Sequence, residues 1–177
     1  MRKNILTLFN KKDGLARART GIIFFLVALI VFAMDQGSKN WVVNNFHPGE
    51  SLPLLGEILY ISHVRNPGAA FGLFAYKTPF FIGISIVMII LTVIAAHQIP
   101  PRLAQLRLGL AVMLGGVMGN LYDRLQTGYV VDFIDFRFWP VFNIADIGIV
   151  VGVFMLAIGL SISAVRSVPE GSDQGGG

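Results

Sequence analysis

Four aspartates between Gly115 and Asp146 are the side chains of this sequence best suited to chemistry. They are Asp123, Asp132, Asp135 and Asp146, and strongly apolar runs lie on both sides of them. Two carboxylates held a few ångströms apart cannot both ionise easily, so near neutral pH one keeps a proton while the other is a base. Such a pair can activate water for attack on an amide carbonyl and protonate the departing nitrogen. The stretch therefore favours acid-base hydrolysis.

Asp146 is one expected member of the pair because it begins an apolar run, but spacing alone leaves its partner open. Asp123 is adjacent to Arg124, which favours an ion pair. Asp132 follows two valines in an extended segment that can fold back over the ends of helices, and it is favoured only slightly over Asp135. All three acids remain candidates at this point.

Other chemistries find little support in the composition. The chain has no Cys, which excludes disulfides, thiolate metal sites and a Cys nucleophile. Its histidines, His47, His63 and His97, lie far apart without metal-ligand spacing, so we expect no metal and no cofactor. His47 and His63 are interpreted as solvated loop residues and Asp135 as a surface acid. The net charge of +4 comes with basic residues beside an apolar run, which fits membrane topology better than nucleic-acid binding.

The elements that must position these acids are transmembrane helices. The chain is 54% hydrophobic and 14% charged, with mean hydropathy +0.68, whereas soluble domains have about 25% charged residues. We expect one membrane domain over residues 1–166 and a disordered tail over 167–177. Four runs are long enough to span a bilayer. They lie at about 21–43, 78–96, 106–122 and 143–165.

The segments between the spans predict the rest of the fold. Residues 44–77 contain three prolines and a run rich in β-branched residues, Glu57 to Arg65, which predicts a small β-sheet. Residues 123–142 are rich in aromatics and are expected at the lipid-water boundary. Gly115, Gly116 and Gly119 allow close helix packing. The predicted fold is an all-α integral membrane protein with four transmembrane helices and a small extracytoplasmic sheet between the first two.

Charge sets the predicted orientation. Nine of the 14 Lys and Arg fall in the N-terminal region, the connection between the second and third spans, and after the fourth. This bias places both termini in the cytoplasm and segments 44–77 and 123–142 outside. Polar residues from distant parts of the chain should then meet at the outer edge of the membrane. They are Asp35, Lys39, Asn120, Asp123, Arg124, Asn143 and Asp146, with Asp35 and Lys39 paired on one helix face.

Five motifs occur in order between Asp35 and Asp146. They are Asp35-Gln36-Gly37-Ser38-Lys39, Asn66-Pro67-Gly68-Ala69-Ala70-Phe71, Gly119-Asn120-Leu121-Tyr122-Asp123-Arg124, Val130-Val131-Asp132-Phe133 and Phe142-Asn143-Ile144-Ala145-Asp146. Together they resemble the motifs of bacterial lipoprotein signal peptidase (signal peptidase II). The resemblance implies an intramembrane aspartic endopeptidase of the bacterial inner membrane, with its active site near the outer face. Its substrates would be diacylglyceryl-modified prolipoproteins, cleaved on the amino side of the lipidated Cys.

Matching the motifs residue by residue assigns roles as well. The resemblance implies that Asp132 and Asp146 are the catalytic pair. It also implies that Asn66, Arg124 and Asn143 bind or orient the substrate. The supporting residues would be Asp35, Lys39, Asn120, Asp123 and Gly68. The implied partners are the lipid-modified prolipoprotein and membrane lipids, and the protein is expected to be a monomer without a metal.

Two other function classes compete with the peptidase. A small transporter or proton channel would place ionisable groups near mid-membrane and usually contains internal repeats, whereas this chain has its acids at one edge and no visible repeat. A non-catalytic lipoprotein-assembly factor would depend on the glycine face or the aromatic segment rather than on the aspartates. Substitution of the aspartates distinguishes these alternatives from the peptidase.

Overall fold

The computed structural model describes residues 2–68 and 77–166, with side chains described from 14 to 162 outside that gap. Its four long helices are α1 (Arg2–Asn45), α2 (Thr78–Gln98), α3 (Ala104–Thr127) and α4 (Ile144–Arg166). A short 3-10 turn, η2 (Pro101–Leu103), joins α2 to α3. The predicted tail over 167–177 lies outside the described residues.

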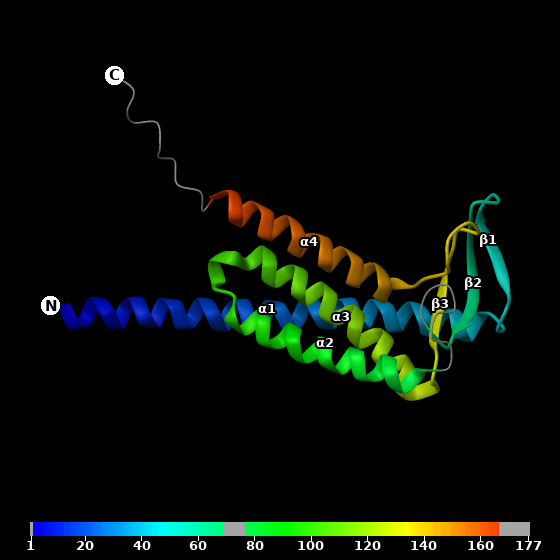
Figure 1. Cartoon of the computed structure of the whole chain (residues 1–177), viewed down its shortest axis with the longest axis horizontal. Helices are drawn as coiled ribbons and strands as arrows, with labels where there is room; N and C mark the ends of the chain where they lie inside the picture. Colours follow the sequence, from blue (N-terminus) through cyan, green and yellow to red (C-terminus); the bar gives the residue numbers. More distant parts are fainter. Residues whose placement is uncertain (1, 69–76, 167–177) are drawn as a thin grey trace, which may run out of the picture.

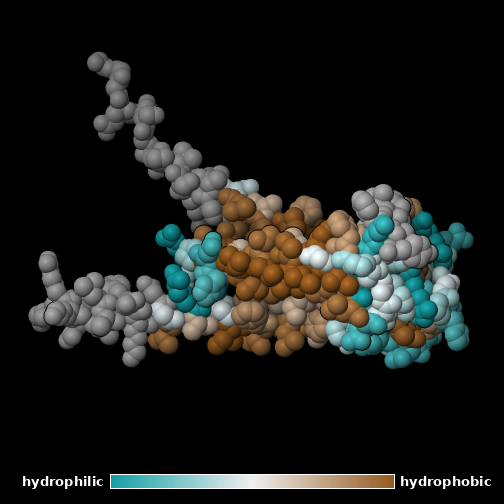
Figure 2. All heavy atoms as spheres, turned by 60° about the horizontal axis from the view of Figure 1, so that its bottom comes forward, coloured by the Kyte–Doolittle hydropathy of each residue, from teal (hydrophilic) through white to brown (hydrophobic). Residues whose placement is uncertain are grey.

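Each long helix, α3 together with the preceding turn η2, provides a segment long and apolar enough to cross a membrane. These segments are Gly14–Asn45, Thr78–Gln98, Pro101–Thr127 and Ile144–Ile162. On the face shown in Figure 2, a belt of hydrophobic side chains covers the bundle between two more hydrophilic ends. The chain is therefore a multi-pass membrane protein, and the predicted all-helical membrane class is confirmed. The basic N-terminal residues continue the first helix, since α1 already begins at Arg2.

Helix α3 is the centre of the bundle and contacts α1, α2 and α4 (Figure 1). Its glycines face different neighbours. A Cβ on Gly115 would lie 2.5 Å from the Ala28 carbonyl oxygen of α1, and one on Gly116 would collide with the Ala145 carbonyl of α4. The predicted packing role of these glycines is confirmed. Without side chains there, the backbones of α1 and α4 approach α3 closely.

A three-stranded antiparallel sheet closes one end of the bundle. Its strands are β1 (Ser51–Leu55), β2 (Leu59–Asn66) and β3 (Val130–Asp135), in the order β1-β2-β3. The predicted sheet between the first two helices is present, but its third strand comes from the segment between α3 and α4. Strand β3 is almost wholly buried, so its sequence lacks the polar-apolar alternation that marks a half-exposed strand.

Two polar residues interpreted as solvated are buried in this sheet, and those interpretations were wrong. His63 in β2 is 2% exposed, and its Nδ1 lies 2.8 Å from the carbonyl oxygen of Phe46. Asp135 in β3 is 6% exposed and accepts hydrogen bonds from Ser62 Oγ and the Arg137 backbone N–H, at 2.7 and 2.8 Å. Both lie in strands whose inner faces pack on the helix ends, a placement that local sequence does not reveal. His47 is exposed, as predicted.

Candidate active site

Asp132 and Asp146 line one cavity of about 300 Å³ where the helix bundle meets the sheet. The wall combines polar groups from β2, α3, β3 and α4 with apolar and aromatic groups from the segment before α4. The lining residues are Asn66, Gly68, Asn120, Arg124, Val130, Asp132, Trp139, Pro140, Val141, Phe142 and Asp146. The sequence-derived candidates with described side chains thus lie in this wall or directly behind it.

Asp132 is buried in β3 and both of its carboxylate oxygens accept hydrogen bonds. Asn143 Nδ2 donates to Oδ1 at 2.6 Å, and Asn66 Nδ2 donates to Oδ2 at 2.8 Å. The pKa of Asp132 is raised to about 7. Burial is the largest cause and the nearby charge of Asp146 adds to it, while the two amide hydrogen bonds and Lys39 lower the pKa. At neutral pH this carboxyl group exchanges a proton readily.

Asp146 is half-buried in the first turn of α4. Its Oδ1 accepts a hydrogen bond from Asn120 Nδ2 at 2.8 Å, and its Oδ2 accepts one from the Asn143 backbone N–H at 3.2 Å. The Asp146 backbone N–H donates in return to Asn143 Oδ1 at 2.9 Å. This reciprocal pair caps the helix in the manner of a capping box. The cap fixes where the carboxylate points.

Asn143 connects the two aspartates. It is fully buried, and its Nδ2 faces Asp132 while its backbone N–H and Oδ1 bond to Asp146. The same Nδ2 lies 3.2 Å from Asn120 Oδ1, and that oxygen also accepts a hydrogen bond from Lys39 Nζ at 3.0 Å. Each amide therefore has one consistent donor and acceptor orientation, which aims an N–H at each aspartate.

Behind the amides lies a buried ionic cluster centred on Lys39. Its Nζ lies 2.8 Å from Asp35 Oδ2 and 2.9 Å from Asp123 Oδ2. Asp35 Oδ1 accepts a hydrogen bond from the Ala145 backbone N–H at 2.9 Å, and Asp123 Oδ2 accepts one from the Val131 N–H at 3.2 Å. The cluster therefore joins α1, α3, α4 and β3, the elements that carry both aspartates.

Two contacts of this cluster differ from the sequence-based prediction: the partner of Asp123, and a hydrogen bond from Gln36. The predicted Asp35–Lys39 pair is confirmed, but Asp123 pairs with Lys39 rather than with Arg124, because adjacent residues of a helix point in different directions. Gln36 was not a candidate, yet its Nε2 donates to Asp123 Oδ1 at 2.9 Å. Its position three residues before Lys39, on the same helix face, was the available signal.

Arg124, Asn66 and Gly68 form one edge of the cavity. Arg124 Nη2 donates to the Gly68 carbonyl at 3.2 Å, and its guanidinium lies 4.8 Å from the centre of the Phe81 ring. The Gly68 N–H donates to Asn66 Oδ1 at 3.0 Å. The motif residues Ala69, Ala70 and Phe71 lie outside the described residues. This edge can present amide and guanidinium donors to a bound molecule.

Metal ligands do not gather here. Among the side chains that the structure describes, no group of three or more His, Asp or Glu is arranged to hold a metal ion. What the cavity offers instead is a pair of carboxylates, a set of oriented amides and one guanidinium. That arrangement suits proton transfer to and from a bound amide.

Comparison with known proteins extends this picture. The model of the Signal peptidase (SPase) II family matches residues 27–162. A lipoprotein signal peptidase of Moorella thermoacetica is 52% identical over 141 residues, covering 80% of this chain and 94% of the relative. One from Pelotomaculum thermopropionicum is 42% identical over 136 residues, covering 77% and 90%. A bacterial membrane enzyme solved by the in meso method superposes with a TM-score of 0.78 at 30% identity, covering 85% of this chain and 94% of that one.

The family model spans every motif singled out in the sequence and both aspartates of the cavity. The matches cover nearly the whole length of the relatives, so the likeness concerns the whole membrane domain and not one motif. They favour a peptidase over the transporter and the assembly factor. The chain belongs to the signal peptidase (SPase) II family.

Proposed function

We propose that this protein is an aspartic endopeptidase that removes the signal peptide from diacylglyceryl-modified prolipoproteins, cutting on the amino side of the lipidated Cys. Asp132 and Asp146 would be its catalytic pair. The observation that carries the proposal is that both carboxylates line one cavity and are held by the same residue, Asn143. Family membership supplies the substrate class.

The chemistry needs one proton shared by the pair. Asp132, with its pKa raised to about 7, carries it, and Asp146 is the base. Asp146 takes a proton from water as the water oxygen attacks the scissile carbonyl carbon, and Asp132 gives its proton to the carbonyl oxygen. The resulting diol collapses when Asp132 takes a hydroxyl proton back and Asp146 gives its proton to the nitrogen. The C–N bond then breaks, leaving a carboxyl group and an amine.

The remaining cavity groups suit binding and orientation. Asn66 and Asn143 hold Asp132 at hydrogen-bonding distance, and Arg124 presents donors beside them that can bind a substrate carbonyl. Because these groups lie in a protein-lined site, their charges act on the developing oxyanion with little screening by water. Asp35, Lys39, Asn120, Asp123 and Gly68 would act by holding this geometry.

The position of the cavity suits a lipid-anchored substrate. Its lining residues belong to the sheet and to the helix ends beside it. The helices meet the sheet at this end (Figure 1), and the hydrophobic belt ends there (Figure 2), so acyl chains can stay against the helices while the peptide enters the polar site. We propose that residues 1–166 form one peptidase domain that acts as a monomer in the bacterial inner membrane. Both termini would be cytoplasmic, and the sheet would lie at the outer face, as the charge bias favours.

Two isosteric substitutions test the mechanism. In detergent without added metal, D132N and D146N should each lower cleavage of a lipidated precursor by at least about a thousandfold, since each removes a proton carrier. D135N is the matched control, because Asp135 lies in the same strand but bonds to Ser62 rather than lining the cavity. Turnover near the wild-type rate in either cavity variant would overturn the mechanism. Equal cleavage of an unlipidated precursor would overturn the substrate assignment.

A further inference from the structure

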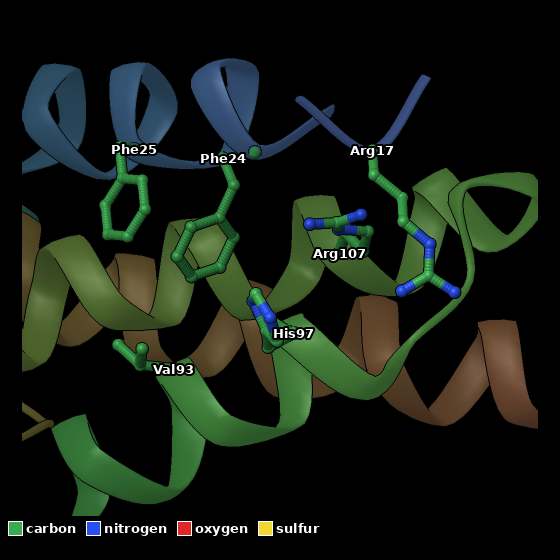
Figure 3. Close-up of a pocket in the computed structure, with 8 residues that line it drawn as sticks. Arg17, Phe24, Phe25, Val93, His97 and Arg107 are labelled. Carbon is green, nitrogen blue, oxygen red and sulfur yellow. The ribbon is translucent and has the colours of Figure 1, made fainter. Parts of the chain in front are cut away.

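A second cavity, of about 260 Å³, lies between α1, α2 and α3 (Figure 3). Its residues belong to the helix ends opposite the sheet (Figure 1). Phe24 and Phe25 of α1 and Val93 of α2 form an apolar wall. Arg17 of α1, His97 of α2 and Arg107 of α3 contribute nitrogen groups (Figure 3). The cavity thus combines a mainly apolar wall with two guanidinium groups, and none of its residues belongs to the proposed active site.

Arg107 is the unusual residue of this cavity. It is 8% exposed, and its Nη1 donates to Thr20 Oγ1 at 2.7 Å. Its Nε is buried and has no hydrogen-bond partner among the described residues. A guanidinium stays charged at every physiological pH, and a buried charge without a counter-ion costs free energy. Arg107 therefore holds a buried donor and a charge that an anion would satisfy.

No protein carboxylate supplies that anion within the described side chains. The ion pairs there join Lys39 to Asp35 and Asp123, and Arg137 to Asp135, all toward the sheet. Asp13 precedes Arg17 by four residues, and its side chain is outside the described set. A neighbouring cavity of about 290 Å³ shares Arg17 and adds Arg102. The two cavities together are thus lined by three arginines, of which Arg17 belongs to both.

We propose that this cavity binds the phosphate of an anionic phospholipid. Arg107 and Arg17 would donate to the phosphate oxygens, for which the guanidinium fork is well suited. The first carbons of the lipid chains would lie against Phe24, Phe25 and Val93. A lipid fits better than a free phosphate because the cavity combines cations with an apolar wall at the edge of the hydrophobic belt, the depth of lipid headgroups (Figures 2 and 3).

Lipid titration of the purified full chain in a neutral detergent, followed by native mass spectrometry, tests the proposal. Dioleoyl-phosphatidylglycerol should bind at least about tenfold more tightly than dioleoyl-phosphatidylcholine, and glycerol 3-phosphate should compete only weakly. R107Q and R17Q should each weaken phosphatidylglycerol binding about tenfold, because each removes a charged donor. R19Q is the control, since Arg19 is exposed on the same part of α1 but does not line the cavity.

Each result decides the matter. Equal binding of the two lipids, or an equal loss in R19Q, means a general attraction of charge and overturns the proposal. Competition by glycerol 3-phosphate at the affinity of the lipid means a free-phosphate site and overturns the lipid assignment. Since R107Q alters a buried residue, its fold is checked by thermal unfolding. If it does not fold, R17Q, which alters an exposed side chain, decides by itself.

Discussion

At the scale of single residues, the proposed function depends on how the protein divides one proton between two carboxylates. Asp132 lies in a buried strand and Asp146 in a helix N-terminus, so their surroundings differ although their chemistry is the same. Desolvation disfavours the anion of Asp132, whereas Asp146 is half-buried and accepts a hydrogen bond from the Asn143 backbone N–H at the start of α4. The same residue type can thus act as acid at one position and as base at the other.

This division predicts the alkaline limb of the pH profile. Because the pKa of Asp132 is raised to about 7, the pair loses its shared proton above that pH. Cleavage efficiency should therefore fall about tenfold per pH unit above about pH 7. Initial rates at low substrate between pH 5 and 9 measure it, with D135N as a variant that should keep the same profile. A rate that stays constant to pH 9 would contradict a proton carried by Asp132.

The raised pKa also predicts how stability changes with pH. The folded state holds the Asp132 proton more tightly than the unfolded state, where the pKa is near the ordinary 3.8. Its contribution to stability is therefore fully present below about pH 4 and is lost as pH rises through about 7. The unfolding midpoint of the wild type in detergent should fall across this window more steeply than that of D132N. Parallel curves for the two proteins would refute this linkage.

Lys39 does not line the cavity, but replacing it should still damage the active site. Replacing it with Met leaves Asp35 and Asp123 buried without their cation, which costs about 3–5 kcal/mol for a broken buried pair. It also removes the donor that orients Asn120. We expect a lower unfolding midpoint and strongly reduced cleavage, measured by tryptophan fluorescence and by precursor processing. K77M, an exposed lysine at the start of α2, is the control and should change neither. An unchanged midpoint in K39M would mean that the cluster does not hold the helices together.

At the scale of elements, the site depends on how closely α1 and α4 approach α3. A Cβ on Gly119 would collide with the Asp35 carboxylate and lie 3.3 Å from the Ala145 Cβ. G119A should therefore destabilise the protein by about 1–3 kcal/mol and lower cleavage, because the Lys39 cluster must shift. G37A is the matched control, because Gly37 also lies in a helix but a Cβ there would meet no atom within 4 Å. This variant should be as stable as the wild type or slightly more stable. Comparing the two unfolding midpoints separates a steric effect from one of helix propensity.

The sequence predicts the spans and one ion pair of this fold, but not which residues of the sheet are buried. Long apolar runs and charge bias suffice for four spans, and helical spacing suffices for the Asp35–Lys39 pair. Burial of His63 and Asp135 could not be predicted, since it depends on β3 pairing with β2 across more than sixty residues of chain. Spacing favours Asp132 over Asp135 only slightly, and the family resemblance makes the choice. Spacing is insufficient because both acids are buried in β3, although of the two only Asp132 lines the cavity.

At the scale of the whole molecule, the ionisable groups are separated along the bundle. The described carboxylates gather near the sheet, whereas Arg17, Arg102 and Arg107 lie at the opposite end, with the hydrophobic belt between them (Figure 2). Basic residues at helix ends are retained on the cytoplasmic side of bacterial inner membranes. The distribution of charge therefore predicts the orientation of the molecule independently of its chemistry.

That orientation can be measured directly, because the chain contains no Cys and a maleimide therefore labels only the one thiol that is introduced. Glu57 is exposed between β1 and β2, and Gln105 is exposed at the start of α3, at the arginine end. In intact spheroplasts a membrane-impermeant maleimide should label E57C, while Q105C should react only after the membrane is broken. The two proteins should react alike in detergent, which controls for local reactivity. The reverse pattern would place the aspartates on the cytoplasmic side, where an exported lipoprotein precursor does not present its cleavage site. That result would refute the proposed substrate but would not contradict the catalytic pair.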